Sequence, residues 1–428
     1  MDLDYFVLNV KKRAAGRWRS PLESLQDNWQ DSTVLGGVLG TPDSSQAGHD
    51  AIAVETTKLS EVQAREAARD PANTVAPVMP VNLIAPLNAA EYGISSDGDP
   101  VTVARTAKRS WGIDATAANA SNLTGEGVVV AILDTGVDER HPAFPENGIN
   151  WVRQNFSGGD STDTSDRQGH GTHCAGTVFG RDVDGTRIGI ARGVSTAIIG
   201  KVLDDQGRGS TASVLKALHW AGSQGANVVS MSLGFDFPGM QEQLTQLGRP
   251  PKLATSMALK AYRENLRMFE TLLAYLLLEN PASAGMVVVA ASGNESMRHV
   301  DPNFVIDTSL PAAASANILS VGAIRRQGDL FGIAPFSNVN PVLCAPGVDI
   351  VSAKAGGGLV AMSGTSMACP HVAGLAALWW QKAAASGRAT AGTVRAHVVA
   401  AAQDEGFAEG VGQVDRGEGR AMAPPAPR

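Results

Sequence analysis

The chain has 428 residues, of which 43% are hydrophobic and 18% are charged. This composition excludes a disordered chain and provides enough apolar material for one large domain or for two to three smaller ones. The formal net charge of -7 gives no electrostatic basis for binding nucleic acid or an anionic membrane, so we expect neither as a partner.

The first hundred residues mix strand and helix patterns. The segments "DYFVLNVK" and "VAPVMPVNLIAPL" are strand-like, whereas residues 59–69, "LSEVQAREAAR", have the composition of a helix. A connector that contains Gly, Asp, Ser and Pro follows at about residues 93–100. Residues 1–108 are therefore predicted to form a small α+β domain with its linker, separable from the rest of the chain.

The N-terminus lacks the pattern of an export signal. Its longest apolar run, Tyr5–Leu8, is shorter than the apolar region of a signal peptide. No stretch approaches the roughly 18 uninterrupted apolar residues of a membrane-spanning helix. As written, the chain is expected to be cytoplasmic, and secreted if an export signal is missing from this sequence.

Between residues 128 and 324 the sequence repeats a short apolar run, a turn and a helical stretch. The apolar runs are "VVVAIL" (128–133), "AIIGKVL" (197–203), "NVVSMSL" (227–233), "MVVVAA" (286–291) and "ILSVGAI" (318–324). Such runs are typical of parallel strands buried on both faces, and their alternation with helices predicts an α/β layer structure. In such sheets, binding sites form beyond the carboxyl ends of the strands.

Four polar residues occupy positions suited to a site of this kind. Asp134 and Asn294 directly follow apolar runs, in "AILDTGVD" and "VVVAASGNE". His170 lies between glycines in "GHGTHCAG", and Ser366 opens an apolar stretch in "SGTSMACPHVAG". Each also has a structural interpretation on its own: a turn former, an Asx turn, a structural or solvated histidine, and a helix cap. We leave His173 with the structural interpretation.

Taken together, the four residues supply the groups needed for acyl transfer. A serine hydroxyl is a weak nucleophile until a base takes its proton, and the base needs an acidic partner that holds its tautomer. The tetrahedral intermediate then needs N–H donors aimed at its developing negative charge. Ser366, His170, Asp134 and Asn294 provide one candidate for each role.

The same segments carry a family resemblance. "DTGVD", "GHGTHCAGT", "SGNE" and "GTSMACPHVAG" resemble, in this order, the motifs of the subtilisin-like serine proteases, especially the proteinase K-like branch. The resemblance covers about residues 111–420. It implies a subtilisin-like three-layer α/β domain with a mostly parallel central sheet, preceded by a small α+β propeptide-like domain, and a serine endopeptidase activity.

The resemblance also implies a role for each residue. Asp134 would be the orienting acid, His170 the general base, Ser366 the nucleophile and Asn294 the oxyanion donor. Ser366 would begin the central buried helix, so that its own N–H joins Asn294 in the oxyanion hole. Pro370 would then fall at the edge of the first turn, where a missing N–H costs little.

The resemblance further implies a groove that holds an extended peptide as an added strand. Its walls would be "GRG" and "SMSLG", and the segment before Asn294 would border the pocket for the residue before the cut. The implied substrate-binding residues are Gly207, Arg208, Gly209, Ser232, Leu233, Gly234, Ala291, Ser292 and Gly293. Arg208 would either favour an acidic substrate side chain or simply be solvated.

The chain departs from the family in two regions. Residues 238–283 form an insertion in a predicted catalytic domain of residues 109–422, with a helix expected around Lys260–Leu278, and this insertion is either a surface decoration or a docking or gating element. Residues 1–108 resemble an inhibitory propeptide, which implies an intramolecular inhibitor removed by cleavage between about residues 90 and 115. Residues 423–428 are predicted to be a disordered tail.

Cofactors are not required for this chemistry. Cys174, Cys344 and Cys369 are too few for a disulfide framework and lack the spacing of a zinc site, so we interpret them as thiols, with Cys174 as a candidate target of mercurials or oxidants. Structural calcium remains open and is not located. The loop that contains Asp160, Asp163 and Asp166 does not fit an EF-hand and is interpreted as a solvated acidic loop, so no metal residues are assigned.

Three functions compete at this stage. The first is a serine endopeptidase of broad specificity that acts on polypeptides and matures by self-cleavage. The second is a silent or prodomain-locked protein that uses the groove to bind a peptide. The third is a peptide ligase or macrocyclase, which delivers an amine in place of water to the same acyl-enzyme.

Overall fold

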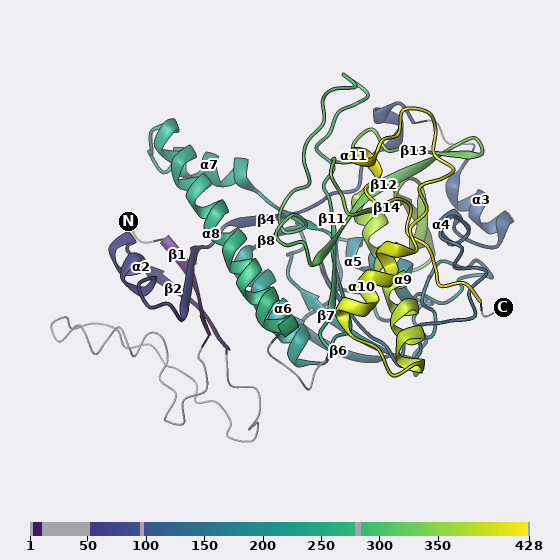
Figure 1. Cartoon of the computed structure of the whole chain (residues 1–428), viewed down its shortest axis with the longest axis horizontal. Coiled ribbons are helices and arrows are strands. Elements are labelled where there is room, and N and C mark those ends of the chain that lie inside the picture. Colours follow the sequence, from purple (N-terminus) through teal and green to yellow (C-terminus); the bar gives the residue numbers. More distant parts are fainter. Residues whose placement is uncertain (1–2, 11–51, 95–97, 279–283, 427–428) are drawn as a thin grey trace. The chain divides into compact units, whose positions relative to one another are not determined.

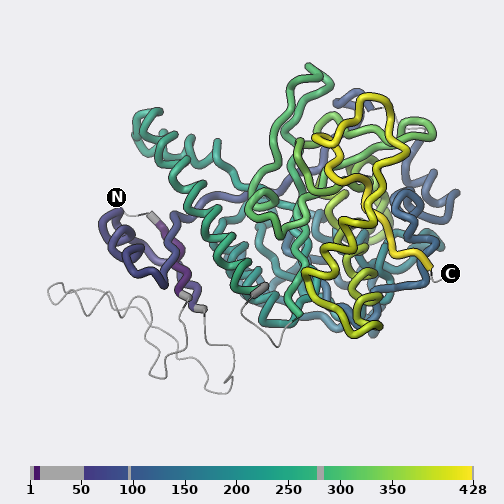
Figure 2. The backbone as a smooth tube through the Cα atoms, viewed as in Figure 1, coloured from purple at the N-terminus to yellow at the C-terminus, as the bar shows by residue number. Residues whose placement is uncertain are grey.

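The computed structural model describes residues 3–10, 52–94, 98–278 and 284–426 (Figures 1 and 2). These residues form two compact units, each described here by itself. The small unit comprises the chain up to Met79 together with Phe237–Leu272, and the large unit comprises Pro80–Asp236 together with the chain from Leu273 onward. The helical insertion therefore belongs to the same compact unit as the N-terminal strands.

The small unit is built on a three-stranded antiparallel sheet in the order β2-β1-β3. Its elements are β1 (Leu3–Val10), β2 (Ile52–Leu59), α2 (Glu61–Ala67), β3 (Asn73–Pro77), α7 (Phe237–Gln246) and α8 (Pro251–Leu278), the last of which continues into the large unit. Ser60 starts α2 through a reciprocal capping box with Gln63. The predicted helix in the insertion is thus longer than expected and has a second helix before it.

Helix α8 is tied to the N-terminal strands by a buried amide. The Asn265 side chain is fully buried, and its Nδ2 donates a 2.8 Å hydrogen bond to the backbone oxygen of Pro77. The exposed ion pair between Lys260 and Glu61, at 3.5 Å, adds little because solvent screens it. The buried hydrogen bond shows that α8 is a packed part of the small unit and not a free surface loop.

The large unit contains a mostly parallel sheet in the order β13-β12-β11-β9-β5-β7-β6, with β14 paired to β12. The strands are β5 (Val129–Asp134), β6 (Asn150–Asn155), β7 (Thr196–Lys201), β9 (Val228–Met231), β11 (Val287–Ala291), β12 (Ile318–Gln327), β13 (Leu330–Ile333) and β14 (Leu343–Pro346). Only the β12–β13 pair in this sheet is antiparallel. All five predicted apolar runs contribute strands to it, and the predicted α/β class is confirmed.

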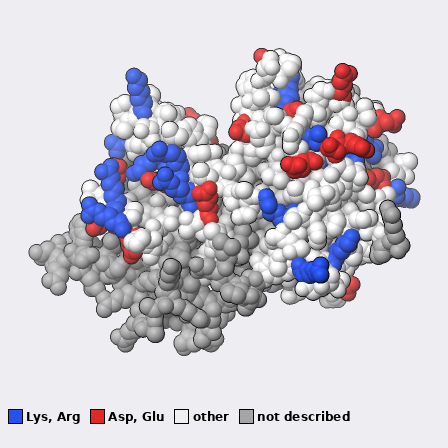
Figure 3. All heavy atoms as spheres, viewed as in Figure 1, with Lys and Arg blue, Asp and Glu red and all other residues white. Residues whose placement is uncertain are grey.

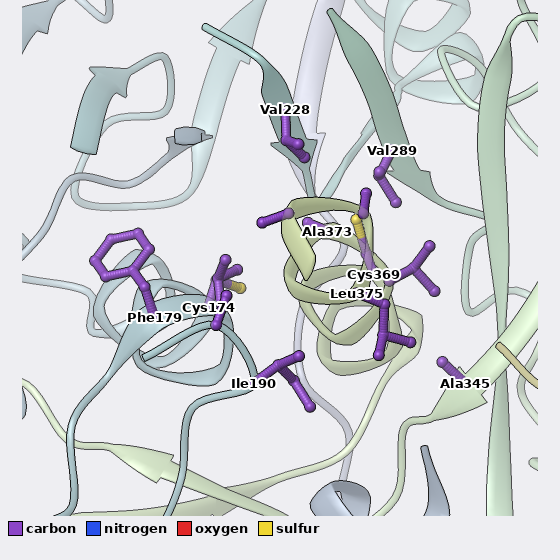
Figure 4. Close-up of a cluster of buried hydrophobic side chains, with 14 of the residues drawn as sticks. Cys174, Phe179, Ile190, Val228, Val289, Ala345, Cys369, Ala373 and Leu375 are labelled. Carbon is purple, nitrogen blue, oxygen red and sulfur yellow. The ribbon is translucent and has the colours of Figure 1, made fainter. Parts of the chain in front are cut away.

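Helices cover both faces of this sheet. Val130 and Ile132 of β5 share a buried cluster with α5 (His170–Phe179) and α9 (Thr365–Ala385). The next residue, Leu133, points the other way: it and Ala217 of α6 (Thr211–Ser223) both lie close to Gly200 of β7. Figure 4 shows α5 and α9 side by side, with apolar side chains of both helices between them and the strands.

The remaining elements surround this core. They are β4 (Pro80–Leu83), η1 (Ala89–Tyr92), α3 (Pro100–Ala107), α4 (Trp111–Ala115), β8 (Arg208–Ser210), β10 (Leu233–Phe235), β15 (Ile350–Ala353), β16 (Leu359–Met362), α10 (Ala391–Ala400) and α11 (Gln413–Arg416). The predicted strand "VAPVMPVNLIAPL" is in fact two strands: β3 in the small unit and β4 in the large unit.

The C-terminal segment is ordered further than its composition predicts. The N–H of Ala423 donates a 2.8 Å hydrogen bond to Thr116, and Ala423 is buried. The expected tail of residues 423–428 therefore does not begin at Ala423, because a backbone hydrogen bond and burial hold that residue. Residues 427–428 lie outside the described part of the chain.

Two further features concern the surface charge and the hydrophobicity of the helices. Acidic and basic side chains both occur on the face of the molecule shown in Figure 3. Within the described ranges, no helix combines the length and the apolar character needed to cross a bilayer.

Candidate active site

Two of the predicted site residues form a buried pair at the end of β5. His170 Nδ1 lies 2.8 Å from Asp134 Oδ1 and 3.0 Å from Oδ2, and both side chains are almost completely buried. A carboxylate only accepts hydrogen bonds, so Nδ1 carries the proton and Nε2 is the free basic nitrogen. His170 Nε2 is buried and has no hydrogen-bond partner among the described residues. Asp134 thus fixes the orientation of the His170 ring.

The loop after β5 and the start of α5 are fitted closely to each other. A side chain at Gly171 would overlap the backbone oxygen of Gly136, so only glycine permits this approach. The Gly171 N–H also donates to Thr135 Oγ1 at 3.0 Å. These contacts bring the strand that carries Asp134 against the helix that carries His170.

A second carboxylate, Asp166, links the loop after β5 to the start of α5. It is only 7% exposed and accepts five hydrogen bonds. The donors are Thr135 Oγ1 (2.9 Å), Gln168 N (3.2 Å), Gly169 N (2.7 Å), Thr172 N (2.8 Å) and Thr172 Oγ1 (2.6 Å). A negative charge here satisfies N–H groups at the first turn of α5 and is favoured by the helix dipole. The interpretation of Asp166 as a solvated residue is therefore wrong.

Ser366 is the second residue of α9, close to where the sequence predicts a helix start, with Gly364 as the N-cap. Its Oγ donates a 2.7 Å hydrogen bond to the backbone oxygen of Ile84. Cys174 lies between the serine and the Asp134–His170 pair: its Sγ is 3.7 Å from His170 Nδ1 and 3.5 Å from the backbone oxygen of Ser366. Helices α5 and α9 thus bring histidine and serine to one place.

The Asn294 side chain is oriented by the start of the same helix. Its Oδ1 accepts hydrogen bonds from Thr365 N and Thr365 Oγ1, both at 2.9 Å. This fixes which end of the amide is the donor, and Nδ2 donates to the backbone oxygen of Ala85 at 3.1 Å. Asn294 therefore donates an N–H group to a backbone carbonyl of the segment that also contacts Ser366.

A groove beside these residues holds a segment of the chain itself. Strand β4 lies between β8 and β10, antiparallel to both. The paired residues are Val81 with Gly209, Asn82 with Arg208, Leu83 with Leu233 and Asn82 with Gly234. Ile84 N–H donates to the backbone oxygen of Ser232 at 3.4 Å, and Leu83 N–H donates to that of Gly207 at 2.7 Å.

The predicted groove residues thus divide into two groups. The segments 207–209 and 232–234 pair with β4 through their backbones. Ala291 and Ser292 are fully buried, and Gly293 N–H donates to Thr365 Oγ1 at 3.2 Å, so this segment supports the start of α9. Arg208 is largely exposed and hydrogen-bonds Asp204 and Gln206.

The family comparison agrees with this architecture. The model of the subtilase family matches residues 125–419, which is more than half of the chain. The chain belongs to the subtilase family. The family resemblance predicted from the motifs is therefore confirmed.

Individual proteases are similar to this chain over 260–299 residues. Subtilisin-like protease 6 of Trichophyton verrucosum is 36% identical over 260 residues, which are 59% of this chain and 52% of that protein. M-protease of Shouchella clausii is 32% identical over 292 residues, 68% of this chain and 63% of that protein. The alkaline protease of Alkalihalobacillus alcalophilus is 32% identical over 299 residues, 69% and 65%. The chain thus spans between about half and two thirds of the length of these relatives.

Burial keeps two further histidines and two thiols near the subtilase site uncharged. Burial lowers the pKa of His173 to about 3 and that of His371 to about 4, so both imidazoles are neutral. His173 Nε2 donates to the backbone oxygen of Ile350 at 2.9 Å, which fits the structural interpretation. Burial also raises the pKa of the Cys174 thiol well above its usual range and that of Cys369 to about 11.

Potential metal ligands are engaged by protein groups. Ligand atoms of Asp134, His170 and Cys174 lie within 4.8 Å of one another, but the imidazole nitrogen that faces Asp134 is used in their hydrogen bond. In the acidic loop, Asp160 accepts hydrogen bonds from Thr162, and Asp163 pairs with Arg167 at 2.9 Å. These contacts order the side chains of the acidic loop.

Sequence reasoning missed two parts of this site. The buried Asp166 was hidden by its position in a polar run, since its partners come from Thr135 and from the helix start. The segment Ile84–Ala85 was predicted only as the end of a strand, and nothing in its composition indicates contact with Ser366 or Asn294.

Proposed function

We propose that this chain is an endopeptidase in which Ser366 is the nucleophile, His170 the general base, Asp134 the orienting acid and Asn294 an oxyanion donor. One observation carries the proposal: a peptide carbonyl lies against the Ser366 hydroxyl in a groove whose buried His170 is held by Asp134 at 2.8 Å. That combination brings together a hydroxyl, an oriented imidazole and a peptide carbonyl, which are the groups that acyl transfer uses.

The reaction would begin with a peptide laid along the groove as an added strand. His170 Nε2 takes the Ser366 hydroxyl proton while Oγ bonds to the carbonyl carbon. Asn294 Nδ2 and the Ser366 N–H stabilise the oxyanion, which the dipole of α9 also favours. His170 then gives its proton to the leaving amine, and water hydrolyses the ester through the same groups. No cofactor takes part.

The substrate would be a polypeptide in extended conformation. The backbones of segments 207–209 and 232–234 would pair with it, a mode of recognition that uses main-chain groups and therefore tolerates many sequences. The same groove is occupied here by residues 80–83, which continue from the N-terminal region. We therefore propose that residues N-terminal to the cut act as an intramolecular inhibitor of a self-cleaving zymogen.

The test is labelling by a fluorophosphonate probe together with peptide hydrolysis. The purified chain should take one probe molecule at Ser366 and release free termini from a reporter peptide, whereas Ser366→Ala should do neither. Asp134→Asn should fold and lose most activity, because the imidazole tautomer would no longer be fixed. A chain that binds the peptide without label or hydrolysis would refute the proposal and support a silent binding protein, and ligated product masses would indicate a ligase.

A further inference from the structure

The segment that crosses the active site touches the two catalytic donors with two different carbonyl groups. Ser366 Oγ donates to the backbone oxygen of Ile84 at 2.7 Å, whereas Asn294 Nδ2 donates to the backbone oxygen of Ala85 at 3.1 Å. Attack needs both groups on one peptide: the hydroxyl oxygen at the carbonyl carbon and the amide at the carbonyl oxygen. Neither peptide bond is placed for attack in this arrangement.

The hydroxyl proton is also directed away from its base. Because Ser366 Oγ donates to a carbonyl oxygen, it does not donate to His170, whose Nε2 is buried without a hydrogen-bond partner among the described residues. A serine whose proton is held by the bound segment is a poor nucleophile. The segment thus fills the groove and also separates the nucleophile from its base.

We infer that self-cleavage occurs at the Ile84–Ala85 bond, and that residues 84–86 act as a latch that delays it. In the latched arrangement Ser366 and Asn294 contact the carbonyl groups of two successive residues, and cleavage requires a shift that brings both to the carbonyl group of Ile84. The inference rests on the proposed function and adds to it the bond that is cut and the step that delays the cut. Residues 84–86 are called the latch.

The upstream side of the latch fixes which residue lies at the nucleophile. Strand β4 is hydrogen-bonded on both edges, and Ile84 N–H continues this pairing to Ser232. The Ile84 side chain is 5% exposed and that of Val81 is fully buried, whereas Ala85 is exposed. Moving Ala85 to the nucleophile would pull two buried side chains out of place, so the cut is expected after Ile84.

The downstream side of the latch also disfavours the neighbouring bond. Ala85–Pro86 is a tertiary amide whose ring adds bulk at the leaving nitrogen, and proline confines the residue before it to extended conformations. Leu87 N–H donates to the backbone oxygen of Ser363 at 2.8 Å, which anchors the chain directly after the proline. Pro86 is therefore held between two anchors and resists the shift that would align both donors.

The step itself is ordinary acyl transfer. The latch slips so that the Ile84 oxygen reaches Asn294 Nδ2, and Ser366 Oγ bonds to the Ile84 carbonyl carbon as its proton passes to His170. The C–N bond to Ala85 breaks as His170 returns the proton to that nitrogen. Water then hydrolyses the ester, leaving a carboxylate on Ile84 and an amine on Ala85.

The same register indicates what the groove prefers in other substrates. The residue before the cut and the residue three positions upstream are the buried aliphatics Ile84 and Val81. A side chain at Gly207 would begin 3.0 Å from Leu83 Cβ, so this glycine makes room for the bound strand, whereas one at Gly234 would begin 3.6 Å from Ile84 Cγ1, an ordinary contact distance. We expect peptides of the pattern Val-x-x-Ile to be cut after isoleucine.

The experiment follows the full-length chain by intact-mass spectrometry and N-terminal sequencing. The wild type should yield a new N-terminus at Ala85. Ala85→Pro should remain full length because it turns the cut bond into a tertiary amide, whereas the matched Ala85→Gly should be cut at the same bond. Pro86→Ala should be cut at Ala85 and lose its full-length form faster than the wild type.

The outcomes separate this inference from the proposed function. An N-terminus at Pro86, one between residues 90 and 115, or a full-length wild type would overturn the inference even if the probe labels Ser366. Pro86→Ala that matures no faster than the wild type would refute the delaying role of the latch. A chain that neither labels nor cleaves anything would remove the proposed function itself, and this inference with it.

Discussion

Asp166 should contribute strongly to the stability of the large unit, and Asp166→Asn measures that contribution. The substitution keeps the shape of the side chain but replaces one carboxylate oxygen with an NH₂ group. The favoured orientation keeps the remaining oxygen toward Thr135, Gln168 and Gly169 and turns the NH₂ group toward Thr172. The Thr172 N–H then faces another donor inside the protein.

The magnitude follows from the bonds that are lost or weakened. A hydrogen bond to a charged group contributes about 1.5–3 kcal/mol, and a neutral one about half as much. The fifth bond, from Thr172 Oγ1, can reverse, because a hydroxyl also accepts from the new NH₂ group. One lost bond and three weakened ones then correspond to about 3 kcal/mol or more. For a unit of this size, the melting temperature should then fall by about 6–12 °C. Calorimetry in a Ser366→Ala background, where self-digestion cannot occur, measures the shift.

Asp163→Asn is the matched control. Asp163 lies three residues earlier in the same loop, and its partner Arg167 is largely exposed. An exposed ion pair contributes about 0–1 kcal/mol, so this variant should melt within about 2 °C of the parent. An Asp166→Asn protein that also melts within 2 °C of the parent would refute the reasoning, as would equal losses in the two variants.

Three further predictions follow from other groups. Asn294→Ala should lower kcat about 10²- to 10³-fold in peptide hydrolysis with little change in KM, and an unchanged kcat would exclude the oxyanion role. Burial keeps His371 neutral down to about pH 4 and His173 neutral down to about pH 3, whereas the pKa of histidine in the unfolded chain is about 6.5. The unfolded state therefore binds more protons, and the free energy of unfolding falls as the pH drops from 6 to 4. Urea titrations should show a slope of about 1.4 kcal/mol per pH unit for each histidine, and His371→Leu should reduce the slope by one proton. Iodoacetamide at pH 8 should leave the folded chain unlabelled, since burial raises the thiol pKa values, and fast labelling of Cys174 in the folded chain would contradict this.

The sequence predicts the parts of this fold that depend on local pattern. Continuous Val and Ile runs, such as 128–133, identify strands because burial on both faces requires apolar residues at every position. Ser366 near a helix start is predictable because Gly364 precedes it, but the prediction that Pro370 falls at the edge of the first turn is wrong, since Pro370 is the sixth residue of α9 and lies inside the helix. The position of Asp134 at a strand end follows from the same pattern.

The parts that escaped prediction depend on contacts between distant residues. The Ser366 hydroxyl meets Ile84 across 282 residues of sequence. Asn265 reaches the Pro77 oxygen across 188 residues, which places the insertion helix in the small unit. Propensity and hydrophobic period carry no information on such pairings, so neither the occupied groove nor the extent of the small unit could be read from local sequence.

The small unit is formed by two separate segments of the chain, and this limits what a cut after Ile84 would release. Residues 3–10 and 52–79 would belong to the N-terminal fragment, but Phe237–Leu272 would remain covalently attached to the rest of the chain. One folded unit would then consist of two polypeptides, joined by its core and by the buried hydrogen bond of Asn265. Hydrolysis of one peptide bond would not free the fragment, because dissociation must also break up this shared unit. The lifetime of the inhibited state would be set by the unfolding of the small unit and not by the chemistry of the cut.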